Sequence, residues 1–232
     1  MSDRDDALQG LQEGLGYTFR DWRLLEQALR HRSAAHEQGV PSFERLEFLG
    51  DAALSHAVAA LLFTRWPDAS EGELTRARAA VVREASLAVL ADQLGLPATL
   101  QLGSGLREGS ASPAVLADAL EAVLGALLLD AGWRSFRAAV NRLFSPLVTT
   151  LDPAQLALEE PKSTLQELAQ KQGLPLPFYR EVEIRGPAHH RVYVYEVEFD
   201  GRVLARGEGR SKKAAQQEAA RRALERLEGI EA

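Results

Sequence analysis

The fold is decided by the stretch Glu44-Arg45-Leu46-Glu47-Phe48-Leu49-Gly50-Asp51. Glu44, Glu47 and Asp51 stand at i, i+3 and i+7, a spacing that places all three carboxylates on one face of a helix. The residues between and after them are mostly apolar, which predicts a helix that packs into a core. Carboxylates are rarely buried without a compensating partner, so this helix is expected to serve a site.

A second acidic pair, Asp118 and Glu121, lies at i and i+3 within residues 115–129, which are almost wholly apolar. Like charges on one helix face repel, and burial strengthens the repulsion. A cation is therefore expected between the acidic residues, and a divalent metal is the simplest choice. For Glu44, Glu47 and Asp51 the alternative is a solvated helix face with salt bridges to Arg45 or Arg78, and spacing alone leaves both interpretations open.

Composition restricts the metal and the compartment. The 232 residues contain no cysteine, which excludes disulfides and thiolate-bound zinc. The five histidines show no metal-ligand spacing, so oxygen ligands and Mg²⁺ or Mn²⁺ are expected. Residues 1–9 are acidic and polar rather than a signal peptide, and no apolar run is expected to span a membrane. We therefore expect a cytoplasmic protein without membrane contact.

Charge is distributed unevenly along the chain. Residues 1–160 carry a net charge of −8 and contain no lysine, whereas residues 161–232 carry +2 and contain all four lysines. Such asymmetry predicts two modules with different partners. We expect a helical domain at 1–149, a linker at 150–160 and a second domain at 161–229.

Apolar periodicity predicts helices in the first module, at 21–31, 44–64, 74–94, 113–131 and 135–149. Ser70 and Glu73 fit a capping box, and Ser112-Pro113 is typical of a helix start. The stretch 74–94 is expected to form one long helix that ends at Gly95.

The second module has a different periodicity. A helix is expected at 163–172, with Ser163 and Gln166 as a capping box. Strands are expected at 179–185, 191–199 and 202–207, and a helix capped by Ser211 extends to about 227. Asp200-Gly201 predicts a tight hairpin. The fold class is thus an all-α domain followed by a small α+β domain of order α-β-β-β-α.

These motifs together resemble the ribonuclease III family followed by a double-stranded-RNA-binding domain. The residues that carry the resemblance are Gly16-Tyr17-Thr18-Phe19, Ala28-Leu29-Arg30-His31-Arg32-Ser33, the 44–52 signature, 116–125 and Gly207-Glu208-Gly209-Arg210-Ser211-Lys212-Lys213-Ala214-Ala215. Two departures stand out. The family often has Thr where this chain has Arg30, and a basic or polar run where it has Ser110-Ala111-Ser112-Pro113.

The resemblance implies metal-dependent hydrolysis of double-stranded RNA, with 5′-phosphate and 3′-hydroxyl ends and ribosomal precursors among the substrates. It makes Glu47, Asp51, Asp118 and Glu121 the catalytic and metal-binding acids. Paired Mg²⁺ ions roughly 4 Å apart suit such chemistry. Glu44 and Glu71 match acidic positions near the RNA backbone, although an acid in the first turn of a helix is also favoured by the macrodipole alone.

The resemblance also assigns partners. Phe48, by default a core residue, would instead insert into a second copy of the chain in a homodimer, which places one active centre on each RNA strand and gives staggered cuts. Lys212 and Lys213 oppose the helix macrodipole, a cost that bound phosphate would offset. Further RNA contacts are expected from Gln166, His189, His190 and Lys162. For each of these four residues a capping, solvated or surface role remains the alternative.

Two other functions remain open at this stage. The first is a catalytically weak protein that binds duplex RNA and dimerises through its helical domain. The second is a helical scaffold with an unrelated binding domain, which requires the acidic clusters to be coincidental. Strand cleavage distinguishes the enzyme from both.

Overall fold

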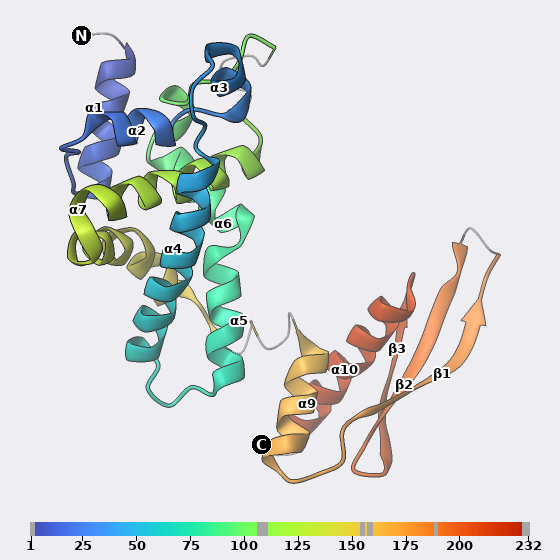
Figure 1. Ribbon diagram of the computed structural model, residues 1–232. Coiled ribbons are helices and arrows are strands. Elements are labelled where there is room, and N and C mark those ends of the chain that lie inside the picture. The colour runs from blue at the N-terminus through green and yellow to red at the C-terminus, as the bar shows by residue number, and fades with distance from the viewer. Residues whose placement is uncertain (1–2, 106–110, 154–155, 157–159, 188–189, 229–232) are drawn as a thin grey trace. The chain divides into compact units, whose positions relative to one another are not determined.

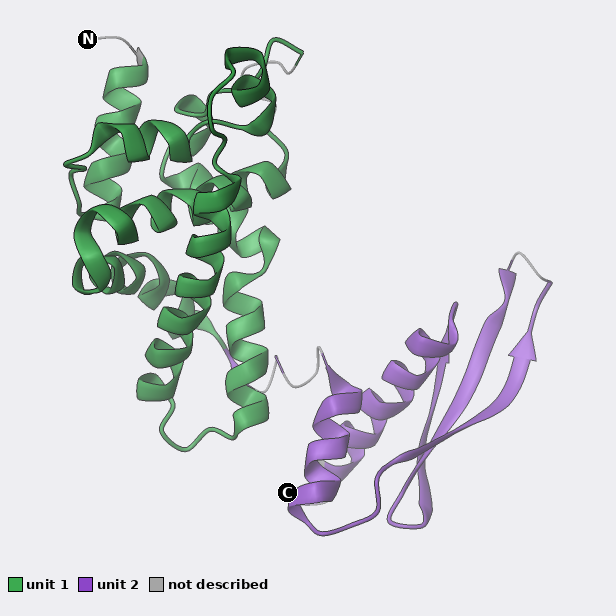
Figure 2. Cartoon of the chain, in the orientation of Figure 1, with its two compact units in different colours: residues 1–151 green, residues 152–232 purple. Residues whose placement is uncertain are grey.

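The computed structural model describes residues 3–105, 111–153, 156, 160–187 and 190–228. The chain divides into two compact units, residues 1–151 and residues 152–232 (Figure 2). The expected domain bounds, 1–149 and 161–229, and the linker expected at 150–160 remain predictions. Each unit is described by itself.

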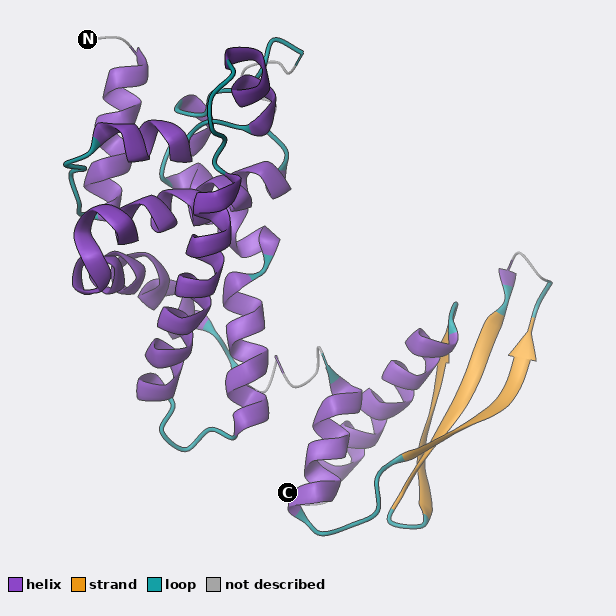
Figure 3. Ribbon diagram, viewed as in Figure 1, coloured by secondary structure: helices purple, strands orange, loops and turns teal. Residues whose placement is uncertain are grey.

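The first unit consists of helices joined by loops and contains no strand among its described residues (Figures 1 and 3). Its elements are α1 (Asp3–Leu15), α2 (Trp22–Ala28), α3 (Arg32–Gln38), α4 (Glu44–Arg65), α5 (Glu71–Val82), α6 (Glu84–Gln93), the short 3-10 helix η1 (Leu96–Ala98) and α7 (Pro113–Thr150). Helix α7 crosses α4 and also packs against α2 and α6, so it forms the centre of the core. Leu54, Leu62, Leu120 and Leu124 are fully buried at this centre.

Several helix boundaries follow the sequence. Ser70 and Glu73 form the expected capping box, and Ser112 accepts a hydrogen bond from the Val115 N–H ahead of Pro113. Gly132 adopts φ 75°, which interrupts α7 where the sequence predicts the end of one helix and the start of another.

The prediction of one long helix at 74–94 is wrong. Arg83 has an extended backbone with φ −65° and ψ 149°, and it separates α5 from α6. The Ser86 hydroxyl donates to the Ala80 carbonyl across this break at 2.8 Å. No glycine or proline marks the position, so the sequence carries no local signal for it.

Two glycines allow α4 and α7 to approach closely. A Cβ atom placed on Gly50 would lie 1.8 Å from the Glu121 carbonyl oxygen, and one on Gly125 would lie 2.1 Å from the Leu46 carbonyl oxygen. Both distances are far below van der Waals contact, so only glycine fits at either position. This crossing brings the two acidic motifs onto neighbouring helices.

The second unit has the predicted order of elements: α9 (Pro161–Lys171), β1 (Phe178–Arg185), β2 (Val192–Phe199), β3 (Arg202–Gly209) and α10 (Lys212–Glu228). The strands form an antiparallel sheet of order β1-β2-β3, with Tyr195 opposite Glu181 and Gly207. Asp200 and Gly201 both have positive φ, 49° and 71°, as a tight hairpin turn requires. Leu165, Val197, Phe199 and Leu224 contribute to a core between the helices and the sheet.

The capping box predicted at Ser163 and Gln166 is wrong. Helix α9 starts earlier, with Glu160 at the N-cap and Pro161 in the first turn, where the missing proline N–H costs no hydrogen bond. Gln166 is consequently an exposed residue in the body of the helix. Ser211, in contrast, caps α10 as predicted, since its hydroxyl accepts the Ala214 N–H at 3.1 Å.

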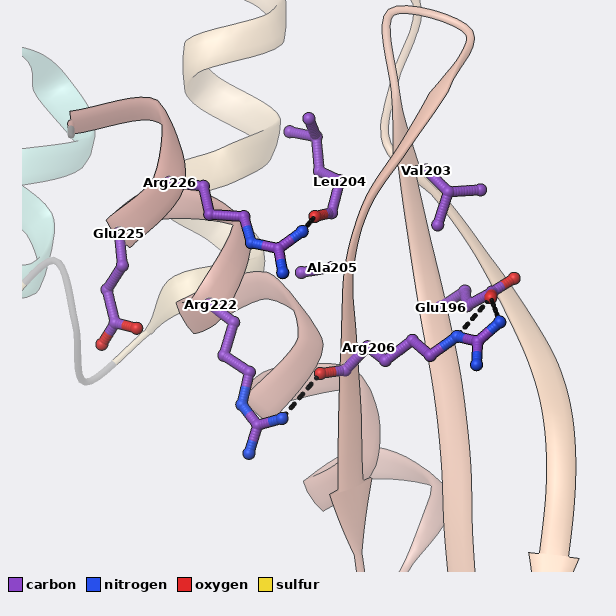
Figure 4. A pocket seen from close by; sticks show the side chains of 8 residues that line it. All are labelled: Glu196, Val203, Leu204, Ala205, Arg206, Arg222, Glu225 and Arg226. Carbon is purple, nitrogen blue, oxygen red and sulfur yellow. Dashed lines mark hydrogen bonds and ion pairs between the residues drawn. The ribbon is translucent and has the colours of Figure 1, made fainter. Parts of the chain in front are cut away.

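Charged side chains cover part of the sheet and its β3 edge. Glu196 is buried between Arg180 and Arg206, at 2.7 Å from an Arg180 nitrogen and 2.6 Å from Arg206 Nε. Arg222 and Arg226 of α10 donate to the Arg206 and Leu204 carbonyls of β3 and line a hollow there (Figure 4). Edge carbonyls that already accept hydrogen bonds are protected from pairing with a foreign strand.

Contrary to the sequence expectation, one helix among the described residues, α4, is long and apolar enough to cross a membrane by length and composition alone. The core helix of a globular protein passes the same test. Because α4 carries Glu44, Glu47 and Asp51 and packs along α7, we assign it to the protein core.

Candidate active site

Three carboxylates converge where α4 crosses α7. One oxygen from each of Glu47, Asp118 and Glu121 lies within 4.8 Å of the other two, and all three side chains are half-buried. We call these three residues the acidic cluster. They come from the two separate sequence motifs, which the glycine crossing of α4 and α7 brings together.

The acidic cluster is electrostatically unfavourable without a cation. Burial, followed by repulsion from Asp51, Asp118 and Glu47, raises the pKa of Glu121 to about 8. Burial and the charges of Asp118, Glu44 and Asp51 likewise raise the pKa of Glu47, and burial followed by the charge of Glu84 raises the pKa of Asp118. Paired carboxylates with raised pKa values are typical of functional sites.

Asp51 and Glu44 lie at the rim. Asp51 is exposed and is not one of the three residues whose oxygens converge, although its charge acts on both Glu47 and Glu121. Glu44 is also exposed, and its carboxylate accepts a hydrogen bond from the Ser42 hydroxyl at 2.8 Å. Neither residue, nor Glu47, forms an ion pair with Arg45 or Arg78 within the described part of the chain.

The donor set fits a hard divalent cation. Carboxylate oxygens are the ligands that Mg²⁺ and Mn²⁺ prefer, and Mg²⁺ commonly combines a few carboxylates with waters and substrate phosphates. Bound positive charge would offset the mutual repulsion that raises the three pKa values. The salt-bridge interpretation of these acids lacks its ion pairs, so the metal interpretation accounts for the geometry better.

Sequence reasoning missed several residues of this site. Glu84 is the first residue of α6, directly after the break at Arg83, and its charge acts on Asp118. His31 and Arg32 act on Asp118 with the opposite sign. Both belong to the 28–33 motif, but sequence spacing does not relate residues 31–32 to residue 118.

Glu71 lies apart from the cluster's converging oxygens. It is exposed in the first turn of α5, where its carboxylate accepts a hydrogen bond from the Thr75 hydroxyl at 2.9 Å. This position is favourable to an acid through the helix macrodipole, without further function.

The side chains predicted to contact RNA in the second unit differ in whether they already contact other residues of the chain. Lys212 forms an ion pair with Glu181 at 2.9 Å, whereas Lys213 and Gln166 are exposed. Lys162 is half-buried, with its amine donating to Gln216 at 2.7 Å and lying 4.6 Å from the centre of the Tyr179 ring. His190 is exposed between β1 and β2, and His189 lies outside the described residues.

Phe48 is not a core residue, contrary to the default interpretation. Its side chain is 79% exposed on α4, and Phe63 on the same helix is 72% exposed. Ala52 and His56 are exposed between them at helical spacing. A helix face that exposes two phenylalanine side chains in this way is typical of an interface.

Comparisons with known proteins agree with this architecture. Residues 21–147 match the family model described as Ribonuclease-III-like, and residues 161–227 match the double-stranded RNA binding motif. Ribonuclease 3 of Thiobacillus denitrificans is 47% identical over 221 residues, covering 94% of this chain and 96% of that protein. Ribonuclease 3 of Symbiobacterium thermophilum is 46% identical and covers 91% of each chain.

A solved structure supports the fold of the first unit. The nuclease domain of ribonuclease III from Campylobacter jejuni is 35% identical, with a TM-score of 0.58, and the match covers 66% of this chain and 100% of that one. The family models and the curated relatives cover both units, and the solved structure agrees with the first. The chain therefore belongs to the ribonuclease III family and is an endoribonuclease that acts on double-stranded RNA.

Proposed function

We propose that the chain hydrolyses the phosphodiester backbone of double-stranded RNA with Mg²⁺, or Mn²⁺ in its place, leaving 5′-phosphate and 3′-hydroxyl ends. The convergence of Glu47, Asp118 and Glu121 oxygens within 4.8 Å is the observation that carries this proposal. The family is metal-dependent, and the acidic cluster is chemically suited to a divalent ion.

The four acids share the proposed metal site. Glu47, Asp118 and Glu121 would hold the metal, and we propose that Asp51, whose charge acts on Glu121 from the rim, joins them as a catalytic and metal-binding acid. When bound, the metal lowers the pKa of the attacking water and stabilises negative charge on the attacking and leaving oxygens. Glu44 and Glu71, both exposed, would act on the RNA backbone or on water near the metal rather than bind the ion.

The second unit would hold the duplex by shape. RNA-binding domains of this kind contact phosphates and 2′-hydroxyls over about 16 base pairs. We assign phosphate contacts to Lys212 and Lys213 at the start of α10, and minor-groove contacts to Gln166 and to His189 or His190. Lys162 is tied to Gln216 and Tyr179, which favours a role in positioning the start of α10.

We further propose that the enzyme is a homodimer in which Phe48 inserts into the partner chain. A related structure from Campylobacter jejuni, 37% identical with a TM-score of 0.56, is described as flexible in a region involved in dimer formation. A twofold dimer places one acidic cluster on each strand, which accounts for a staggered cut. We expect the enzyme to act in the cytoplasm on ribosomal precursors and other structured transcripts.

The decisive experiment is cleavage of an end-labelled RNA duplex of about 30 base pairs, longer than the region one binding domain covers. We expect cuts with Mg²⁺ or Mn²⁺, none with chelator, and 5′-phosphates on the products. Glu121→Gln should abolish cleavage and leave duplex binding largely intact, because most of the proposed duplex contacts lie in the second unit. Asp92→Asn, at an exposed acid of α6, is the matched control and should cleave normally.

The competing function is a catalytically weak duplex-binding protein. Tight binding with no cuts under any metal would favour that function and overturn the proposed hydrolysis. Full cleavage by Glu121→Gln would instead remove this residue from the metal site.

A further inference from the structure

The α2–α3 junction lies against the start of α4, one of the two helices that carry the acidic cluster. The Arg30 carbonyl accepts the Phe43 N–H, directly before α4, at 3.0 Å. The His31 N–H donates to the Gln101 carbonyl at 3.0 Å, and the Ser33 hydroxyl accepts the Gly103 N–H at 2.9 Å, in the segment that leads towards α7. Residues 30–33 are therefore hydrogen-bonded both to the segment before α4 and to the segment at residues 101–103.

Side chains add to this fixation. The His31 ring packs edge-on against Phe43, with ring centres 5.7 Å apart, and its Nδ1 atom caps α3 by accepting the Ser33 N–H. The Arg30 guanidinium, at the position where the family often has Thr, donates to Gln101 and to the Pro41 carbonyl, both at 3.2 Å. The backbone that carries Arg32 is thus held firmly in place.

Arg32 is the residue at this junction that remains available. It is the first residue of α3, its side chain is exposed, and its guanidinium has no hydrogen bond or ion pair to any residue the structure describes. Its positive charge acts on Asp118 of the acidic cluster and on His31. A guanidinium without a partner among the described residues is thus carried by a backbone that is fixed against the start of α4, the helix that contributes Glu47 to the acidic cluster.

From this arrangement we propose that Arg32 binds a phosphate of the RNA strand that is cut, at the rim of the acidic cluster. The inference rests on the proposed function, since it needs RNA to enter this site. A guanidinium can donate two parallel hydrogen bonds to phosphate oxygens, a geometry that an amine does not reproduce. A fixed cation near the scissile phosphate also stabilises the negative charge that develops in hydrolysis.

The alternative is that Arg32 only offsets the charge of the acidic cluster. The two roles differ in their salt dependence. A phosphate contact releases counterions from the RNA, and each such contact changes the slope of log K against log salt by about 0.9. A residue that acts only on the carboxylates leaves this slope unchanged and alters the Mg²⁺ concentration needed for cleavage.

The test combines a binding and a kinetic measurement on the full chain. Duplex affinity would be measured between about 50 and 300 mM KCl, because phosphate contacts make the affinity fall steeply as salt rises. The two proteins compared are the Glu121→Gln variant with and without Arg32→Ala. We expect Arg32→Ala to reduce the slope by about 1. In the otherwise unaltered chain, we expect Arg32→Ala to lower the single-turnover cleavage rate by about 100-fold at saturating Mg²⁺, and Arg32→Lys to recover the slope but only part of the rate.

Arg137→Ala, at an exposed arginine in the second half of α7, is the matched control for loss of one positive charge. If Arg32→Ala matches this control in slope and rate, or lowers the rate with an unchanged slope, the phosphate contact is overturned. Failure of the parent chain to cleave RNA under any metal would instead overturn the proposed function, and the slope measurement would still decide whether Arg32 contacts phosphate.

Discussion

At the scale of single residues, Glu121 shows that the acidic cluster lowers the stability of the folded, metal-free protein at high pH. Its pKa is about 8 in the folded chain because of burial and the charges of Asp51, Asp118 and Glu47. The unfolded chain releases this proton near pH 4.3. Between these values the folded state binds more protons than the unfolded state, so stability falls as the pH rises.

We therefore expect Glu121→Gln to stabilise the metal-free protein at pH 8.5 and to have little effect at pH 4, the two sides of this window. Allowing for solvent screening at this partly exposed group, the gain should be on the order of 2 kcal/mol. Thermal unfolding with chelator, followed by tryptophan fluorescence, measures it, because Trp22, Trp66 and Trp133 all lie in the first unit. An equal effect at both pH values would contradict the electrostatic explanation.

At the scale of elements, the crossing of α4 and α7 depends on its two glycines. Gly50→Ala would place a methyl group 1.8 Å from the Glu121 carbonyl oxygen, so the helices would have to separate. We expect a loss of about 3 kcal/mol or more in the free energy of unfolding, and weaker divalent-ion binding, because the acidic cluster spans the same crossing.

Gly10→Ala is the control for this substitution. Gly10 also lies within a helix, but a Cβ atom there would have no neighbour within 4 Å. Alanine should therefore stabilise the chain by about 0.5–1 kcal/mol through helix propensity. Urea unfolding of both variants measures the difference, and a similar effect at the two glycines would argue against the close crossing.

Prediction from sequence succeeds where the signal is local in the chain and fails where it is not. Local signals, such as the Ser70–Glu73 capping box, the Asp200-Gly201 turn and the acidic spacing on α4, concern neighbours in the chain and predicted the elements correctly. The break at Arg83 carries no such signal, because no glycine or proline stands where the backbone becomes extended.

For the acidic cluster, the sequence predicts the need for a cation but not which helices meet to form the site. Repulsion between acids on one helix predicted that a cation is needed, but spacing within a helix does not show which helices meet. The convergence of Glu47 with Glu121 depends on backbone contact at Gly50 and Gly125, which becomes visible only in three dimensions. The position of the backbone that carries Arg32 likewise depends on hydrogen bonds between residues 30–33 and residues 43, 101 and 103.

Within the sheet, Glu196 links the three strands through charge. Hydrogen bonds from Arg180 on β1 and Arg206 on β3 lower the pKa of Glu196 on β2. A lowered folded-state pKa gives stability that is present above the unfolded pKa of about 4.3 and is lost as the pH falls through the folded value. We expect Glu196→Gln to weaken the acid dependence of sheet unfolding.

Infrared absorption of the sheet measures this effect, since the described strands all belong to the second unit. Glu198→Gln, at an exposed acid on the same strand, should unfold with acid as the parent does. Identical acid transitions for Glu196→Gln and the parent chain would show that the paired arginines do not stabilise the sheet.

At the scale of the whole molecule, binding and cutting are assigned to separate units. Lys212→Ala combined with Lys213→Ala should weaken duplex binding and reduce the salt slope by up to about 2, one contact each. Lys212 already pairs with Glu181, so its contribution requires exchange of that partner and should be the smaller. Lys171→Ala, at an exposed lysine of α9, is the control, and an unchanged slope in the double variant would exclude both lysines from the interface.

Dimerisation determines whether the two strands are cut together. Phe48 is 79% exposed in the single chain, and burying a phenylalanine stabilises an interface by about 1.5–3 kcal/mol. A twofold interface buries two copies, so Phe48→Ser should raise the dimer dissociation constant by about 100-fold or more. Sedimentation equilibrium measures this constant.

Phe178→Ser is the control. It removes a phenylalanine that is 62% exposed in the second unit and should leave the dimer dissociation constant unchanged. A monomeric Phe48→Ser chain that binds duplex RNA but cuts only one strand at a time would show that the staggered cut arises from two chains; a dimer of undiminished stability would remove Phe48 from the interface.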